Sequence, residues 1–262
     1  MKLNKLSLFL FLWLFSLTVT VSAQKVPEKP YQKWSKDEAT KLLTDSPWVR
    51  TYQSQRGIAE ASSDQIRREQ ADQRLYRASE AGAAARTMAP VPVVMRLHSA
   101  LPIRQALVRL RQIQAGYDKM DDKQRADFDK ANEALLGCVI CRKFYVVTMT
   151  RFIDSTRQSV DEGVFQRMTL EQLKGNVWLA NDKGERRELV QFIPPKDDKD
   201  MAVFFFARLD EKGNPLLTPE SKRFEFVFNN TFFNSSNPYA SWLPRNFEFS
   251  VPKLMHGSEI EF

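Results

Sequence analysis

The sequence predicts an α+β protein, in which an N-terminal helical segment and two further helices precede an antiparallel β-sandwich-like domain or small barrel. In the first half, apolar residues recur at the spacing of helices, whereas after Gly137 they alternate with a period of two. The alternating stretches are short and separated by turn residues, which is typical of antiparallel sandwiches and small barrels. Because the helices precede the strands instead of alternating with them, a βαβ arrangement is excluded.

The first 23 residues have the three-part layout of a secretory signal peptide. Lys2 and Lys5 precede an uncharged run over residues 6–21, and small residues stand ahead of a cut predicted after Ala23. The uncharged run is short for a membrane span. We therefore expect a secreted or periplasmic protein that does not span a membrane after cleavage, and an uncleaved N-terminal anchor is the alternative.

Residues 24–52 are expected to form an N-terminal helical segment. Ser35 and Glu38 have the spacing of a capping box, in which each side chain bonds to a free backbone N–H at the start of a helix. A helix of about three turns follows from these signals, because a proline ahead of Trp48 disfavours further helix. Trp34 and Trp48 bracket this helix, and we expect both indoles to clamp it onto a domain.

The stretch at 53–92 is rich in Ala, Gln, Arg and Ser and has few large apolar residues. We predict a polar flexible linker here, with an exposed helix as the alternative, between the segment at 24–52 and a globular domain at 93–262. Residues 24–117 carry 16 Lys and Arg against 9 Asp and Glu. Since the basic positions are interspersed with acidic ones, we interpret them as a solvated surface and expect no nucleic-acid partner.

The globular domain is expected to begin with a strand at 93–98 and two helices. Pro102 opens the first helix, and the second covers 123–136, with Asp121 or Asp122 as its cap and Gly137 as its end. The apolar stripe of the first helix consists of Ile103, Ala106, Leu107, Leu110 and Ile113. Three arginines are expected mainly outside that stripe: Arg104, Arg109 and Arg111.

Strands make up most of the remaining domain. The stretch at 201–209 is apolar on both faces and therefore belongs in the middle of a sheet, with Arg208 interpreted as a charge that protects its end from aggregation. Glycine turns at 181–184 and 210–213 are expected to join neighbouring strands. The other expected strands are 144–153, 176–180, 188–193, 224–228, 247–251 and an edge strand at 259–262.

Several motifs resemble one group of proteins. The segment Trp34-Ser35-Lys36-Asp37-Glu38-Ala39, followed by Asp45-Ser46-Pro47-Trp48, resembles the N-terminal signature of uncharacterised secreted bacterial proteins of acidobacterial type. The runs at 169–175 and 188–195 also resemble that group. The resemblance covers most of the mature chain and implies secretion. Since the group has no assigned activity, it implies no catalytic residues.

Cys138 and Cys141 form a CxxC motif and are both of the cysteines in the chain. Three interpretations are open: a structural disulfide, a pair of buried reduced thiols, or a thiol–disulfide exchange site. Redox CxxC pairs usually lie at a helix N-terminus, whereas this pair follows a predicted helix end. The β-branched Val139 and Ile140 favour an extended or turn-to-strand junction at this point.

Aromatic residues gather in a predicted loop at 229–243, where Phe232, Phe233, Tyr239 and Trp242 stand among small polar residues. These four side chains could bind a carbohydrate or peptide, or they could close the end of the sandwich. The sequence leaves both interpretations open.

Sequence motifs for catalysis, metal binding or cofactor binding are otherwise weak. His98 and His256 are the two histidines, and neither is accompanied by a Gly-x-Ser-x-Gly nucleophile motif. We expect no metal site and no cofactor, because a second CxxC, a histidine pair and a glycine-rich phosphate loop are missing. The expected function is that of an exported, non-enzymatic structural or binding module whose partner is an envelope component, a polysaccharide or a protein. The alternative is a periplasmic thiol–disulfide redox protein that uses Cys138 and Cys141.

Overall fold

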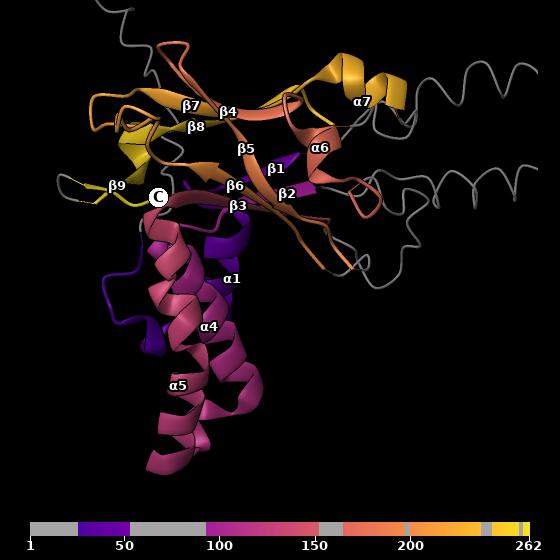
Figure 1. Cartoon of the computed structure of the whole chain (residues 1–262). Coiled ribbons are helices and arrows are strands. Elements are labelled where there is room, and N and C mark those ends of the chain that lie inside the picture. Colours follow the sequence, from indigo (N-terminus) through magenta and orange to yellow (C-terminus); the bar gives the residue numbers. More distant parts are fainter. Residues whose placement is uncertain (1–25, 53–92, 152–164, 197–199, 237–242, 257–258) are drawn as a thin grey trace, which may run out of the picture.

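The structure is a computed structural model, and it describes residues 26–52, 93–151, 165–196, 200–236, 243–256 and 259–262 (Figure 1). The expected signal peptide at 1–23 and the expected linker at 53–92 lie outside the described residues. In the part of the chain that is described, none of the helices has the length and apolar character needed to cross a membrane.

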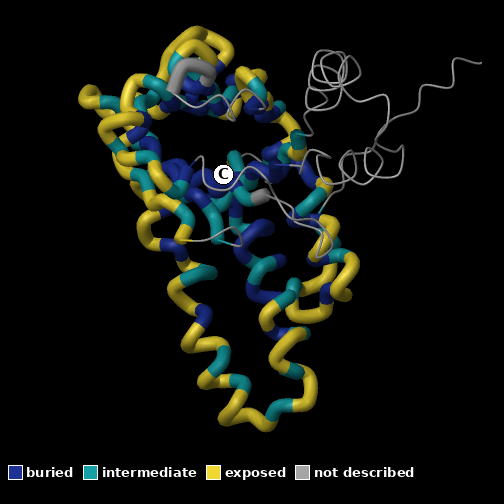
Figure 2. Tube along the Cα trace, turned by 90° about the vertical axis from the view of Figure 1, so that its right-hand side faces the viewer, coloured by how far each residue is buried: buried dark blue, intermediate teal, exposed yellow. Residues whose placement is uncertain are grey.

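Three longer helices lie side by side and project from one side of a sheet (Figure 1). Helix α4 packs against both α1 and α5 and is therefore the middle one. The lower ends of these helices are mostly exposed in Figure 2. The helices are α1 (Lys36–Thr44), α4 (Leu101–Ala115), α5 (Asp122–Gly137), α6 (Leu170–Leu173) and α7 (Asn230–Ser236), with 3-10 helices η1 (Tyr31–Lys33), η2 (Tyr117–Lys119), η3 (Val139–Arg142) and η5 (Val251–Leu254).

The sheet has eight antiparallel strands in the order β1-β2-β3-β6-β5-β4-β7-β8. Its two edge strands contact each other: Arg50 Nε donates to the Glu248 carbonyl at 2.6 Å, and the Tyr52 ring lies edge-on to Phe247. The sheet is thus nearly closed and barrel-like, which confirms the predicted fold class. The strands are β1 (Val49–Tyr52), β2 (Val93–Leu97), β3 (Phe144–Arg151), β4 (Val177–Asn181), β5 (Arg186–Ile193), β6 (Ala202–Ala207), β7 (Arg223–Phe228) and β8 (Asn246–Ser250).

The start of α1 follows from its sequence. Ser35 Oγ accepts a hydrogen bond from the Glu38 N–H, and the Glu38 carboxylate accepts one from the Ser35 N–H, so the predicted capping box is present. Both tryptophans that bracket the helix are buried in the main core, and Trp48 Nε1 also donates to the Glu261 carbonyl at 2.6 Å. The N-terminal segment further supplies β1, which pairs with β2 and which the sequence patterns did not predict.

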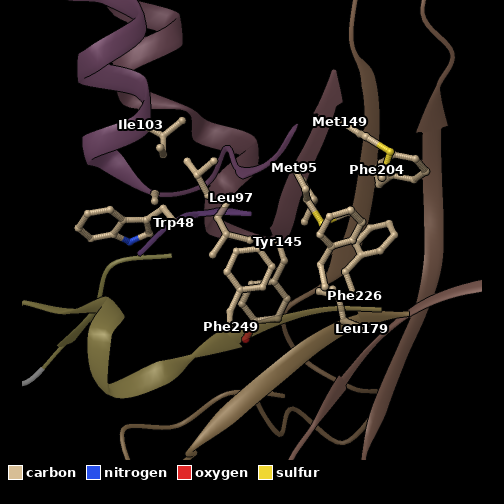
Figure 3. Close-up of a cluster of buried hydrophobic side chains, with 14 of the residues drawn as sticks. Trp48, Met95, Leu97, Ile103, Tyr145, Met149, Leu179, Phe204, Phe226 and Phe249 are labelled. Carbon is tan, nitrogen blue, oxygen red and sulfur yellow. The ribbon is translucent and has the colours of Figure 1, made fainter. Parts of the chain in front are cut away.

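Aromatic side chains occupy the interior of the barrel. Phe224, Phe226 and Phe228 alternate along β7 and are all buried, as their spacing predicts. Phe224 stacks on Phe249 of β8, with 4.9 Å between ring centroids. Figure 3 shows Phe226 and Phe249 within the cluster of buried side chains. Strand β6 lies between β3 and β5, in the middle position that its continuous apolar sequence predicts, and contributes Phe204.

Two other elements have features that their local sequence does not predict. The two-stranded ribbon of β9 (Met255–His256) and β10 (Glu259–Ile260) lies apart from the main sheet, so residues 259–262 do not form its edge strand. Helix α4 also buries Arg104 and Arg109, although both lie mainly outside its apolar stripe, as the spacing predicts. Because α4 lies between α1 and α5, its buried face is wider than its apolar stripe.

Candidate functional site at the disulfide loop

The two cysteines are joined in a short loop between α5 and β3. Cys138 follows the last residue of α5 in the left-handed conformation, with φ of 37°, and the next four residues form the 3-10 helix η3. A disulfide links Cys138 to Cys141, whose Cα atoms are 5.3 Å apart. The prediction of an extended or turn-to-strand junction in preference to a helical turn is therefore wrong. Helix α5 ends at Gly137, as predicted, but the left-handed residue that caps it is Cys138. The left-handed Cys138 and the disulfide together impose a helical turn despite the β-branched Val139 and Ile140.

The disulfide packs on the outer face of the barrel. Cys138 and Cys141 form a small apolar cluster with Val146 of β3 and Phe205 of β6, which are directly paired across the two strands. Side chains of successive strand residues point to opposite faces, and the neighbouring Phe204 belongs to the main core. The cluster therefore lies outside the barrel, and the cysteines are only 8% and 6% exposed beneath their own loop.

Arg208, at the end of β6, holds this loop in place. Its Nε donates to the Cys141 carbonyl at 2.7 Å, a second guanidinium nitrogen donates to the Phe262 carbonyl, and the guanidinium lies 4.6 Å from the centroid of the Tyr145 ring. Burial lowers the pKa of Arg208 and raises the pKa of Tyr145. Beyond its predicted role as a charge that protects the strand end, Arg208 is thus a half-buried link between loop, sheet and C-terminal segment.

Exposed aliphatic side chains surround the disulfide loop. Val139 and Ile140, inside the loop, are 76% and 41% exposed, and Leu209, directly after Arg208, is 54% exposed. Strands β3 and β6 are antiparallel and the Arg208 N–H donates to the Lys143 carbonyl, so Leu209 lies beside the end of η3. We call the following five residues the outer apolar surface: Val139, Ile140, Val190, Ile193 and Leu209.

The two members of the outer apolar surface on β5 belong to the same face. Ile193 pairs with Val203, which packs against the disulfide cluster. Val190 lies in a β-bulge between Leu189 and Gln191. The neighbouring Gln191 is paired with Phe205 of β6. All the exposed large apolar side chains of the described residues therefore gather around the outer face of β3, β6 and β5.

His98 lies near the same junction, between β2 and α4. Its Nδ1 is buried and has no hydrogen-bond partner among the described residues. Burial, with smaller contributions from the cations Arg104 and Arg111, lowers the pKa of His98 to about 4. The imidazole is therefore neutral at pH 7, and the main chain of His98 accepts a hydrogen bond from Arg104.

The four aromatic residues proposed as a binding loop are only partly described. Phe233, on α7, is 1% exposed and packs against Phe228 and Phe165 in the core, while Phe232 is half-buried and lies edge-on to Phe233. Tyr239 and Trp242 lie outside the described residues. The described half of this set thus contributes to packing at one end of the barrel.

No cluster of three or more His, Cys, Asp or Glu side chains that could hold a metal ion occurs within the described ranges. Comparisons of the chain with protein-family models, with curated proteins and with solved structures find no match. The function must therefore be argued from the residues of the site.

Sequence reasoning identified the cysteine pair but missed the contacts of Arg208 and the outer apolar surface. Arg208 contacts residues that are 67 and 54 positions away in the chain, and no local pattern indicates such partners. The outer apolar surface had a weak signal, because Val203 and Phe205 on β6 are apolar on the face opposite to the core. Apolar residues on both faces of β6 predicted a central strand. The same residues are also expected where a partner covers the outer face of the sheet.

Proposed function

We propose that this protein is an exported, non-enzymatic binding module, in which the barrel is a rigid support and the Cys138–Cys141 disulfide is a structural link. The observation that carries the proposal is the gathering of exposed aliphatic side chains around the disulfide loop on a single outer face. Contiguous apolar surface that is rimmed by polar residues is typical of interaction sites.

The position of the disulfide favours a structural link over a redox site. Cys138 follows the C-terminal end of α5, where the helix dipole is negative and disfavours a thiolate. Both cysteines are buried against Val146 and Phe205, and Arg208 fixes the Cys141 carbonyl. Exchange by an external thiol would require access to a sulfur atom that this packing restricts.

Export is proposed from the sequence of the first 23 residues and is compatible with a disulfide, since disulfides persist in oxidising compartments. The test is to express the full chain in a bacterial host, separate the cell fractions and determine the N-terminus of the recovered protein. We expect a mature chain that starts at Gln24 in the periplasm or medium. An intact chain in the cytoplasm would contradict the proposal.

The role of the cysteines is tested by equilibrating the exported protein with glutathione buffers and trapping the free thiols. A structural disulfide is expected to have a reduction potential below about −300 mV. A potential of roughly −120 to −200 mV, which is the range of disulfide-exchange proteins, would support the redox alternative instead.

A further inference from the structure

We propose that the outer apolar surface, together with the cations beside it, binds the surface of an anionic lipid bilayer. This inference rests on the proposed function, because it names the partner of the exported module. The arrangement that carries it is a pair of adjacent loops, η3 and the turn at 210–213, which present exposed aliphatic side chains next to exposed basic ones.

The apolar part of the surface is held rigidly. Val139 and Ile140 lie between the two linked cysteines, in a single 3-10 turn whose Cys141 N–H donates to the Cys138 carbonyl at 2.8 Å. Arg208 fixes the same turn from the other side, so little backbone freedom is left to lose when the side chains enter an apolar phase. Val139 and Leu209 are the most exposed of the five aliphatic residues, and both lie in loops at the same end of the β3–β6 pair.

The charged part of the surface is basic. Arg142 and Lys143 directly follow the disulfide loop, both are exposed, and neither side chain forms an ion pair with a described residue. Lys212 is exposed in the neighbouring turn. Long basic side chains beside aliphatic ones are typical of surfaces that bind anionic lipid headgroups.

The acidic groups nearby do not cancel this charge. Asp210 is held within its own turn: one oxygen accepts the Lys212 and Asn214 N–H groups, and the other lies 4.0 Å from Arg187. These hydrogen bonds lower the pKa of Asp210, which therefore stays ionised, and Arg187 lies close enough to offset its charge. Glu211 is the remaining acidic residue of the turn, against the three cations named above.

The basic charge beside the outer apolar surface favours some binding partners over others. A symmetric dimer through this surface would bring two basic rims together, which disfavours a second copy of the chain. An anionic bilayer has complementary charge and an apolar phase at the depth that aliphatic side chains reach. A protein partner would use the same side chains, and the experiment below distinguishes it.

The test uses the protein recovered after export and vesicles of two compositions: equimolar phosphatidylglycerol and phosphatidylcholine, or phosphatidylcholine alone. We expect the protein to sediment with the anionic vesicles, to sediment far less with the neutral ones, and to be released as salt is added. The double variant Val139→Ser/Leu209→Ser is expected to bind the anionic vesicles about tenfold more weakly, because two exposed aliphatic side chains are lost. The variant Arg142→Ala/Lys143→Ala is expected to lose most of the preference for anionic vesicles.

A matched control removes two exposed cations elsewhere. The variant Lys174→Ala/Lys222→Ala makes the same change in net charge away from the disulfide loop, and its binding is expected to equal that of the wild type. Unchanged thermal midpoints establish that all three variants are folded, which is expected because the replaced side chains are exposed. If the control loses binding as strongly as Arg142→Ala/Lys143→Ala, net charge and not this surface is responsible, and the inference is overturned.

Two other results also overturn the inference. If the protein is exported and has a structural disulfide but binds neither kind of vesicle, the proposed function is retained and the lipid partner is rejected. Crosslinking to an envelope protein that the Val139→Ser/Leu209→Ser variant abolishes, with no vesicle binding, would assign the surface to a protein. Failure of export, by contrast, would overturn the proposed function itself.

Discussion

Arg208 Nε donates a hydrogen bond to the Cys141 carbonyl at 2.7 Å and so joins the end of β6 to a loop 67 residues earlier in the chain. Other buried or half-buried arginines have the same role. Arg104 donates to the Leu136 carbonyl, Arg109 to Trp34 and Arg96 to Leu43, at distances of 3.1, 2.7 and 2.7 Å. The planar guanidinium can serve several acceptors at once, and Arg109 also pairs with the Asp118 carboxylate at 3.2 Å. Arginine–carbonyl links therefore join α4 to α5 and to the segment before α1, and they join α1 and the disulfide loop to the barrel.

The first prediction concerns this link. Replacing Arg208→Lys keeps the charge but removes the geometry that serves two carbonyls and a tyrosine ring together. We expect the free energy of unfolding to fall by about 1 to 3 kcal/mol, measured by urea denaturation. The control is Arg223→Lys, because Arg223 is about half exposed and its carboxylate partners lie on the surface. Equal stabilities of the two variants would show that Arg208 does not hold the loop.

The second prediction separates the disulfide from the backbone conformation of Cys138. The variant Cys138→Ala/Cys141→Ala is expected to lose about 2 kcal/mol of stability, since so small a loop constrains the unfolded chain only modestly. Cys138→Gly/Cys141→Ala also lacks the disulfide but is expected to be about 1 kcal/mol more stable than the alanine variant, because glycine adopts the left-handed conformation without strain. Denaturant unfolding of both proteins measures the difference. A glycine variant no more stable than the alanine variant would mean that the turn rearranges once the disulfide is gone.

The third prediction is a pH dependence of stability from His98. Because its folded-state pKa is lowered to about 4, the unfolded chain binds more protons between about pH 6.5 and pH 4. Stability is therefore full above pH 6.5 and falls as the pH drops through this window, by on the order of 3 kcal/mol at its acid end. The variant His98→Gln cannot titrate there, so the difference between the unfolding curves of the wild type and the variant isolates this contribution. A difference that does not change from pH 7 to pH 4 would contradict the assignment.

The sequence predicts the elements whose causes are local. The capping box at Ser35 and Glu38, the left-handed glycines at Gly184 and Gly213 and the alternating phenylalanines of β7 are each determined within a few residues. These signals were sufficient for the α+β class and for the central place of β6.

The sequence does not predict what depends on packing between distant parts. Helical spacing shows which side of α4 is apolar, but it does not show that a second and a third helix cover the other sides and bury Arg104 and Arg109. The backbone of the disulfide loop is a similar case. The intrinsic preference of Val139 and Ile140 for extended structure is small, and the covalent bond together with the Arg208 contact outweighs it.

The last prediction compares the two glycine turns, which share one hydrogen-bond pattern. Asn181 Oδ1 accepts the Lys183 and Glu185 N–H groups, just as Asp210 Oδ1 accepts those of Lys212 and Asn214. The other atom of each side chain differs. Asn181 Nδ2 donates to the buried Leu216 carbonyl at 2.9 Å and to the Glu185 carboxylate at 2.8 Å, whereas Asp210 Oδ2 accepts from Asn214.

Because of this difference, exchanging the amide and the acid side chain is expected to cost more stability in the first turn than in the second. In Asn181→Asp a carboxylate oxygen would face the Leu216 carbonyl and the Glu185 carboxylate, so we expect a loss of about 2 to 4 kcal/mol at pH 7. In Asp210→Asn the two backbone hydrogen bonds are kept and the side chain is partly exposed, so the expected loss is below about 1 kcal/mol. Relative to the wild type at each pH, the deficit of Asn181→Asp is also expected to shrink as the pH falls, because a protonated carboxyl can again donate to the Leu216 carbonyl. Denaturant unfolding at pH 7 and pH 4 measures both effects, and equal losses in the two variants would show that the buried carbonyl does not determine which residue begins each turn.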